Sequence, residues 1–291
     1  MQLAPKITKH VWIMCLALSV ILFSENMANA DAVETTDNHT VNCPATYQQG
    51  TDAKIITQSK AAYEKTCEKV IVPAYHRYLN SGETGSFEEF AADNYYEQEA
   101  PGLKGDVTTN VTAMGPESTK SGVHPMMNGK TGYKMKAGDI LVVYGRSSSS
   151  HFIGHAAIAT SSKYVLEMTG PGHKSDHHTK ANFFKRNTKG SSYVLVYRIK
   201  KHPTYAKNAA SYAYHHMYKG ARPSYFISTH LYHKDPSYCS KYVYLSYYWG
   251  AKKSSVKKWP EYTHIVTPHG LVGNFKGTFK PNKIHKVTSY K

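Results

Sequence analysis

Three side chains in the C-terminal part of the chain have the types that covalent acyl-transfer chemistry needs. Cys239 closely follows Pro236 and is expected in the first turn of a helix, where unpaired amides favour the nucleophilic thiolate. His155 stands in a strand-like run of small and apolar residues, and Glu167 is the lone acid of the next strand. A cysteine, a histidine that takes its proton and an acid that orients the histidine make a nucleophilic site. We therefore predict Cys239 as nucleophile, His155 as general base and Glu167 as orienting acid.

The hairpin that carries His155 and Glu167 sets a geometric condition on this prediction. Successive side chains of a strand point to opposite faces, so paired positions must have an even sum for the two residues to share a face. A three-residue loop over 161–163 pairs Thr160 with Tyr164 and meets that condition. A two-residue loop would place His155 and Glu167 on opposite faces, unless a bulge corrected the register.

The segments around these residues predict an α+β fold. Apolar patterns predict strands and helices, with strands over 139–144, 152–160, 164–168 and 193–199 and helices over 206–218 and 236–249. Upstream, helical spacing over 52–72 stops at Pro73, which breaks or kinks the helix, and a capping box at Ser86 starts a second helix running to about Glu99. Strands followed by helices predict a mainly antiparallel sheet packed with helices.

Short motifs around the candidate residues resemble a known family. The motifs are similar to the circularly permuted branch of the NlpC/P60 papain-like superfamily, the YiiX/YaeF-like permuted amidase group, which is related to lecithin–retinol acyltransferase-like proteins. They are Gly138-Asp139-Ile140, Gly154-His155-Ala156-Ala157-Ile158, Glu167 and Tyr238-Cys239-Ser240-Lys241-Tyr242-Val243. The permuted order places histidine before cysteine, as in this chain, and the resemblance covers about residues 135–250. It implies a papain-like fold and the roles given above for Cys239, His155 and Glu167.

The resemblance also implies a class of reaction, because members of the superfamily act on amide or ester bonds. It points to a cysteine hydrolase of the amidase or endopeptidase type, a thiol protease in the broad sense, but it does not fix the substrate. The export signal and the basic charge described below predict a secreted protein acting on cell-envelope material such as peptidoglycan. Two alternatives stay open. One is a non-enzymatic cationic cell-wall-binding protein on the same fold, and the other is a lipid acyl hydrolase or acyltransferase. No cofactor and no metal are expected.

The first thirty residues have the pattern of a secretory signal. Lys6 and Lys9 give a basic start, residues 11–23 are apolar, and small residues lead to Ala30. The apolar run is shorter than the roughly 20 residues that span a bilayer. We predict cleavage near Ala30 and a protein that is secreted or associated with the cell envelope, with no membrane span.

Export changes how the cysteines are interpreted. Cys15 lies in the signal segment, which leaves Cys43, Cys67 and Cys239. Cys43 and Cys67 could form one disulfide in an oxidising compartment. Cys239 is then the remaining thiol, and its alternative interpretation is an inert buried cysteine.

The net charge of +16 over 291 residues is distributed unevenly. Residues 31–100 carry 12 acidic and 5 basic side chains, whereas residues 101–291 carry 7 acidic and 29 basic ones. This asymmetry predicts an acidic helical segment over 31–100, a linker or loop over 101–134 and a catalytic domain with a basic tail over 135–291. The acidic segment could be a cap, a pro-segment or an electrostatic clamp. The basic unit favours an anionic envelope polymer or a peptide substrate, and export together with the lack of a motif argues against nucleic acid.

Other polar residues have weaker interpretations. A histidine-rich loop, with His173, Asp176, His177 and His178, lacks the spacing of zinc sites and is expected at the surface. Asp139 and Tyr238 each have two interpretations. Asp139 lies in a motif of the resemblance but also suits a turn cap, and the Tyr238 hydroxyl could lie near the thiolate or pack in the core.

Overall fold

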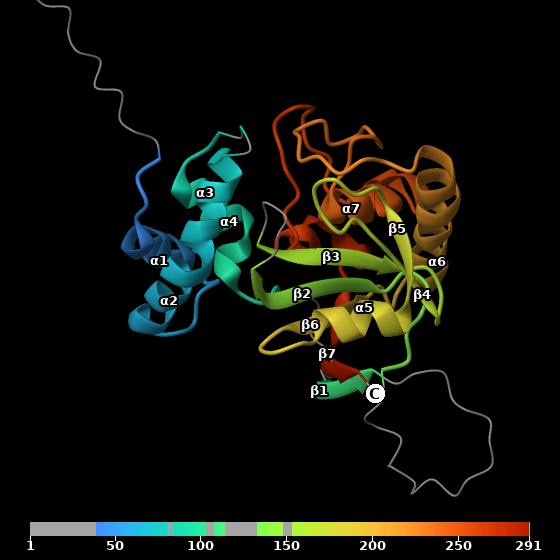
Figure 1. Cartoon of the computed structure of the whole chain (residues 1–291), viewed down its shortest axis with the longest axis horizontal. Helices are drawn as coiled ribbons and strands as arrows, with labels where there is room; N and C mark the ends of the chain where they lie inside the picture. The colour runs from blue at the N-terminus through green and yellow to red at the C-terminus, as the bar shows by residue number, and fades with distance from the viewer. Residues whose placement is uncertain are drawn as a thin grey trace, which may run out of the picture. The chain divides into compact units, whose positions relative to one another are not determined.

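A seven-stranded sheet organises the C-terminal part of the chain (Figure 1). The structure is a computed structural model that describes residues 39–80, 82, 84–102, 108–113, 133–147 and 153–290. The strands lie in the order β1-β7-β6-β2-β3-β4-β5. Their bounds are β1 (Thr108–Ala113), β2 (Ile140–Ser147), β3 (Ile153–Ala159), β4 (Tyr164–Glu167), β5 (Asp176–Thr179), β6 (Tyr193–Arg198) and β7 (Asn282–Tyr290). Neighbours are antiparallel except β1 and β7, so the predicted α+β fold with a mainly antiparallel sheet is confirmed.

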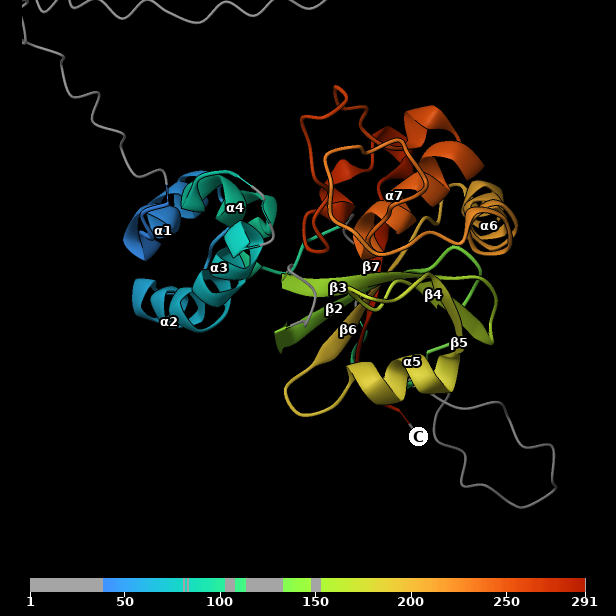
Figure 2. The same cartoon turned by 45° about the horizontal axis from the view of Figure 1, so that its top comes forward.

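Each face of the sheet has its own apolar core. Alternate strand residues such as Leu141 pack with Phe183 and Phe184 on one face, and their neighbours such as Ile140 pack on the other. The covering helices are α5 (Lys180–Asn187), α6 (Pro203–Tyr212) and α7 (Cys239–Gly250). Figure 2 shows α5 on one side of the sheet and α6 and α7 on the other. The sheet is therefore covered by helices on both faces, and α7 packs directly against β3.

In the part of the chain after residue 135, the helices and strands predicted from apolar patterns lie close to their expected bounds, whereas more polar elements were not predicted. Helix α6 continues as π-helical turns over Ala213–Ala221. Strand β5 and helix α5 have no strong apolar periodicity, and β7 lies in the segment expected to be a basic tail. Strand β1 falls inside the segment expected to be a linker. Strands β1 and β7 gain their hydrogen bonds from neighbours far away in the sequence, which a local pattern does not report.

The N-terminal region is helical. Its elements are α1 (Cys43–Asp52), α2 (Lys60–Thr66), a π-helical turn (Cys67–Ile71), α3 (Val72–Asn80) and α4 (Phe87–Asp93). The capping box at Ser86 is present, with Glu89 as its partner, although α4 ends six residues before the expected Glu99. A separate helical region preceding the sheet agrees with the predicted fold class. Residues 38–291 cluster as one compact unit. The expected division of this unit into an acidic helical segment, a linker and a catalytic domain stays a prediction.

The expected continuous helix over 52–72 is wrong in both of its bounds. Ser59 caps a new helix, since its side chain accepts a hydrogen bond from the Ala62 amide. The helical path then continues through Pro73 to Asn80. Proline lacks an amide hydrogen and its ring crowds the carbonyl one turn earlier, and here the turn before it is π-helical rather than α-helical.

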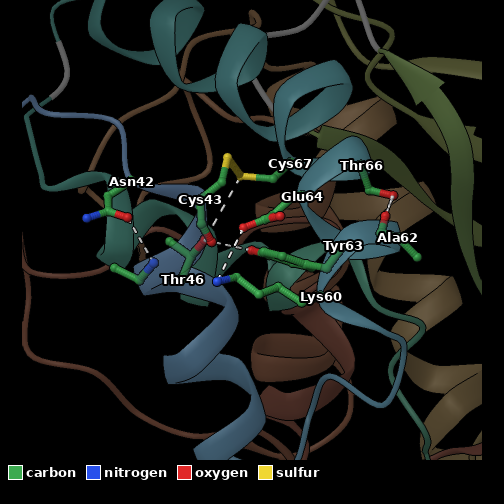
Figure 3. Close-up of a disulfide and its surroundings, with 10 residues drawn as sticks. Asn42, Cys43, Thr46, Lys60, Ala62, Tyr63, Glu64, Thr66 and Cys67 are labelled. Carbon is green, nitrogen blue, oxygen red and sulfur yellow. Dashed lines mark hydrogen bonds and ion pairs between the residues drawn. A yellow bond between two sulfur atoms is a disulfide. The ribbon is translucent and has the colours of Figure 1, made fainter.

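A disulfide between Cys43 and Cys67 joins α1 to the end of α2 (Figure 3). Beneath it, the Tyr63 hydroxyl donates to Thr46 Oγ1 at 2.9 Å, and the Thr46 hydroxyl donates to the Cys43 carbonyl. Both cysteines and Tyr63 are buried in the core of the helical region. The disulfide therefore closes a loop with a sequence separation of 24 around this core.

Ion pairs and backbone contacts attach the helical region to the rest of the unit. Glu99 accepts hydrogen bonds from Lys283 at 3.0 Å and from Lys286 at 2.9 Å on β7. The Thr267 hydroxyl donates to the Asp93 carbonyl. Within the part of the chain that the structure describes, no helix is long and apolar enough to cross a membrane. The predicted signal segment lies outside the described residues.

Removal of the disulfide is expected to destabilise the helical region. Replacing Cys43 and Cys67 together by alanine frees a loop whose closure entropy is worth about 3 kcal/mol in the unfolded state. Urea unfolding followed by circular dichroism should show a fall of that order in the free energy of unfolding. A fall below about 1 kcal/mol would show that the buried contacts around Tyr63 hold the loop without the disulfide.

Candidate active site

Cys239 is the first residue of α7, as the position of Pro236 predicted. Two hydrogen bonds to Val266 fix the chain on either side of it. The Val266 amide donates to the Tyr238 hydroxyl at 3.1 Å, and the Ser240 hydroxyl donates to the Val266 carbonyl at 2.6 Å. The thiol is fully buried and is not part of a disulfide. Its amide lies at the N-terminal end of a twelve-residue helix, where the positive end of the helix dipole is located.

The β3–β4 hairpin brings His155 and Glu167 to one face, as the three-residue loop predicted. Ala157 pairs with Glu167 and Ala159 with Val165, so paired positions have an even sum. Nε2 of His155 lies 2.7 Å from Oε2 of Glu167, and both residues are buried. Because an ionised carboxylate only accepts hydrogen bonds, Nε2 carries a proton and donates it.

The pKa of His155 depends on Cys239 as well as on Glu167, so the thiol and the imidazole are neighbours in the site. Since Nε2 is bound to Glu167, the ring nitrogen left for the thiol is Nδ1. Burial alone would lower the pKa of His155, but Cys239 and Glu167 together raise it to about 9. At neutral pH the imidazole is therefore protonated, which places a proton donor beside the sulfur.

Glu167 is held by more than His155. Its second oxygen, Oε1, accepts from Nη2 of Arg186 on α5, and Nε2 of His178 on β5 lies 3.5 Å from the same oxygen. Burial would raise the pKa of Glu167, but His155 first and then Arg186 and His178 lower it below its usual value. The carboxylate therefore stays ionised in a fully buried position, where it fixes the orientation of the His155 ring.

The backbone before His155 depends on a contact with a second buried histidine. Gly154 has a φ of 74°, a left-handed conformation that favours glycine, and a Cβ there would lie 2.2 Å from Nε2 of His269. The His269 ring stacks on Tyr144 at 3.9 Å, and its Nδ1 lies 2.9 Å from Oε2 of Glu97 in the N-terminal region. Glu97 and His269 thus connect the N-terminal region to the backbone at Gly154, which precedes His155 on β3.

Asp139 and Tyr238, the other two residues with open interpretations, have structural roles. Asp139 is fully buried and accepts from Arg198 Nε at 2.6 Å and from the Tyr133 hydroxyl at 2.7 Å, so it anchors the start of β2. The Tyr238 hydroxyl accepts from the Val266 amide, as described above, and the ring is fully buried in the core. Tyr238 thus fits the core interpretation, and Asp139 fits the turn interpretation.

The histidine-rich loop forms β5 and part of the site's surroundings. His177 Nε2 lies 2.8 Å from the Thr160 hydroxyl, and His178 lies between Glu167 and Asp176. Among the described residues, no three potential ligands are grouped so that they could hold a metal ion. His178 therefore affects the site by lying close to the carboxylate of Glu167, whose pKa it helps to lower.

Sequence reasoning missed Arg186, Gly154 and His269 as parts of the site. Arg186 lies on a helix with no strong apolar pattern, and His269 lies in a loop 114 positions after the histidine that it supports. The Gly154-His155 dipeptide was the available signal, because glycine before a strand residue indicates a close backbone approach.

The chain belongs to a family of lipoprotein-modifying proteins. Residues 108–290 match the family model described as "Lipoprotein N-acylation protein LnsA-like". The matched segment contains Cys239, His155 and Glu167, as well as Arg186 and His269. The family match therefore covers the sheet and its helices, and the helical region over 43–97 lies before the matched segment.

A search of curated proteins finds a relative of unknown function. It is described as an uncharacterized 30.3 kDa protein from Bacillus thuringiensis, and it is 35% identical over 160 residues. The alignment covers 53% of this chain and 58% of the relative, which is less than two thirds of its length. No solved structure matches the chain.

The family corrects the predicted reaction. The family is described by lipoprotein N-acylation, so the predicted amidase or endopeptidase, and with it the thiol-protease and peptidoglycan assignments, is wrong. The alternative of an acyltransferase is the better supported one. The physical reason for the error is that a cysteine–histidine–acid site forms the same acyl-enzyme whether water or an amine accepts the acyl group. The residues that form the acyl-enzyme therefore do not indicate whether water or an amine accepts the acyl group.

The contact between Gly154 and His269 predicts a specific sensitivity at Gly154. Gly154→Ala adds both the cost of a left-handed alanine and a clash with His269, so the free energy of unfolding should fall by about 2 kcal/mol or more. Gly172 is a matched control, because its φ is 80° and a Cβ added there would have no atom within 4 Å. Gly172→Ala should cost only about 1 kcal/mol in the same urea titration. Equal losses in the two variants would contradict the contact.

The charge of Glu167 predicts the titration of His155. In Glu167→Gln the carboxylate charge that raises the pKa of His155 is removed, so that pKa should fall below about 9. The shift is measured by NMR titration of the histidine side-chain nitrogens. Glu99→Gln is the control, since Glu99 binds Lys283 and Lys286 instead. An unchanged His155 titration in Glu167→Gln would show that Glu167 does not hold the imidazolium.

Proposed function

We propose that this protein is a cysteine-dependent acyltransferase that moves an acyl group from a lipid ester to an amino nitrogen of a lipoprotein. The observation that carries the proposal is the buried Cys239–His155–Glu167 arrangement inside the segment that matches the lipoprotein N-acylation family. The roles of the three residues are part of the same proposal.

The reaction proceeds in two steps on one sulfur. Cys239 Sγ attacks the ester carbonyl, a carbon–sulfur bond forms, and the carbon–oxygen bond of the lipid breaks while His155 gives its proton to the departing alkoxide. The acceptor amine then attacks the thioester, His155 takes the proton of the amine, and the Cys239 thiolate departs as the amide forms. Glu167 keeps the ring in one orientation through both steps, because its contact with Nε2 leaves Nδ1 toward the sulfur.

Burial of the site supports transfer to an amine rather than to water. Cys239 is 0% exposed and His155 is 8% exposed, so bulk water has little access to a thioester formed there. An acceptor that binds in place of water would therefore be acylated before hydrolysis occurs.

Kinship with the permuted NlpC/P60 papain-like group is part of the proposal. It is supported by histidine preceding cysteine in the chain, by the cysteine at the start of a helix and by the antiparallel sheet that carries the histidine and the acid. Export after cleavage near Ala30 is likewise a proposal. The disulfide between Cys43 and Cys67 supports it, because such bonds persist in oxidising compartments.

The acyl-enzyme is the species that tests the proposal. The protein from residue 31 onward, incubated with the water-soluble ester p-nitrophenyl butyrate and no amine, should gain one butyryl group on Cys239 that hydroxylamine removes. Cys239→Ala should gain none, and His155→Ala should react more slowly by about 10²-fold or more. Intact-mass and peptide-mapping mass spectrometry measure these outcomes.

Two results would contradict the proposal. One is labelling of Cys239→Ala at the rate of the unaltered protein, and the other is a stable adduct on a residue other than Cys239. Circular dichroism of each variant serves as the control for folding.

A further inference from the structure

Two loops beside Cys239 carry exposed aromatic side chains. Among the residues that the structure describes, four large apolar side chains are exposed: Tyr164 (41%), Phe226 (56%), Trp249 (38%) and Tyr262 (54%). Phe226 and Tyr262 are the most exposed of these, and Phe226 is exposed although its two neighbours in the chain, Tyr225 and Ile227, are buried. An exposed aromatic ring loses the hydrophobic stabilisation that burial would give it, unless another surface covers it.

The loop of Phe226 is bonded to the segment that enters α7. The Phe226 amide donates to the Ser237 carbonyl at 2.9 Å, and the Ser237 amide donates to the Ser224 carbonyl at 3.0 Å. Ser237 lies two residues before Cys239. The Phe226 backbone is therefore held beside the turn that presents the nucleophile.

The loop of Tyr262 is bonded to the other side of the same turn. Val266, four residues after Tyr262, bonds to both Tyr238 and Ser240, the two neighbours of Cys239. The two loops also meet each other, because the His230 ring lies 4.5 Å from the Tyr262 ring. Phe226 and Tyr262 therefore belong to a single rim around the Cys239 end of α7, which we call the aromatic rim.

The aromatic rim carries a cationic border. Lys257 and Lys258 are exposed on the segment leading to Tyr262, and Lys257 lies 5.6 Å from the centre of the Trp259 ring. The exposed acids on the two loops are Asp235 and Glu261, and Asp235 is engaged by the Ser224 amide at 2.9 Å. Residues 101–291 as a whole have far more basic than acidic side chains. Aromatic rings with lysines beside them suit the interface of an anionic bilayer, where rings enter the headgroup layer and lysines meet the phosphates.

We propose that the aromatic rim is a docking surface for an anionic phospholipid bilayer. This inference rests on the proposed function, since a bilayer is where an acyl ester and the lipid anchor of a lipoprotein are both present. Docking through Phe226 and Tyr262 places the turn of Cys239 against the lipid layer. The wider consequence is that the protein needs no membrane-spanning helix to reach its acyl donor.

Vesicle binding tests the aromatic rim directly. The chain from residue 31 with Cys239→Ala, which cannot turn over, is mixed with phosphatidylglycerol–phosphatidylcholine vesicles and separated by flotation. Adding Phe226→Ala and Tyr262→Ala should lower the partition coefficient by about tenfold or more. Adding Lys257→Gln and Lys258→Gln should weaken binding by a similar factor and reduce its dependence on salt.

The matched control is another pair of exposed aromatic residues. Tyr164 lies on β4 and Trp249 at the far end of α7, so Tyr164→Ala with Trp249→Ala removes a similar apolar area from elsewhere on the surface. This pair should leave vesicle binding within about twofold of the parent. Equal losses in the two pairs, or no loss in the Phe226 and Tyr262 pair, would overturn the docking surface.

Other occupants of the aromatic rim are separate outcomes of the same design. Self-association that disappears in the Phe226 and Tyr262 pair, seen by sedimentation without lipid, would identify a second copy as the occupant and overturn the proposal. Binding of a lipoprotein peptide in solution with no affinity for vesicles would do so as well. Because the vesicle assay uses Cys239→Ala and the butyryl assay uses a soluble ester, failure of the docking surface and failure of the proposed chemistry can be told apart.

Discussion

The contact between His155 and Glu167 is the interaction on which the site depends. It places a charged carboxylate in a fully buried position, which is costly unless every oxygen is engaged. His155 takes one oxygen, and Arg186 with His178 takes the other. The three partners of Glu167 come from three different elements, β3, α5 and β5. The fold therefore has to be complete before His155, the proposed partner of Cys239, is oriented.

The N-terminal helices belong to this arrangement through one buried histidine. His269 lies between Glu97 of the helical region and the left-handed Gly154 that precedes His155. Its ring is fixed by stacking on Tyr144. The acidic segment is thus more than a counter-charge for a basic domain, because its Glu97 contacts His269, which lies against the backbone that precedes His155. This contact also gives the helical region a physical connection to the chemistry, although the family match begins after it.

Local rules predicted the parts of the site that depend on local geometry. The three-residue loop settled the shared face of His155 and Glu167, and the proline before Cys239 indicated a helix start. Arg186 could not be predicted, because α5 lacks a clear apolar period and its contact with Glu167 exists only in three dimensions. The reaction class was missed for a chemical reason, since the residues that form an acyl-enzyme are the same for hydrolysis and for transfer.

The central claim is that the acyl group on Cys239 passes to an amine, and a chase experiment measures that step directly. Protein carrying a labelled acyl group on Cys239 is separated from donor and mixed with an N-terminal lipopeptide in a single turnover. The label should leave Cys239 faster as the lipopeptide concentration rises and should appear as an amide on the peptide nitrogen. Release of the label as free acid, at a rate that the lipopeptide does not change, would contradict it.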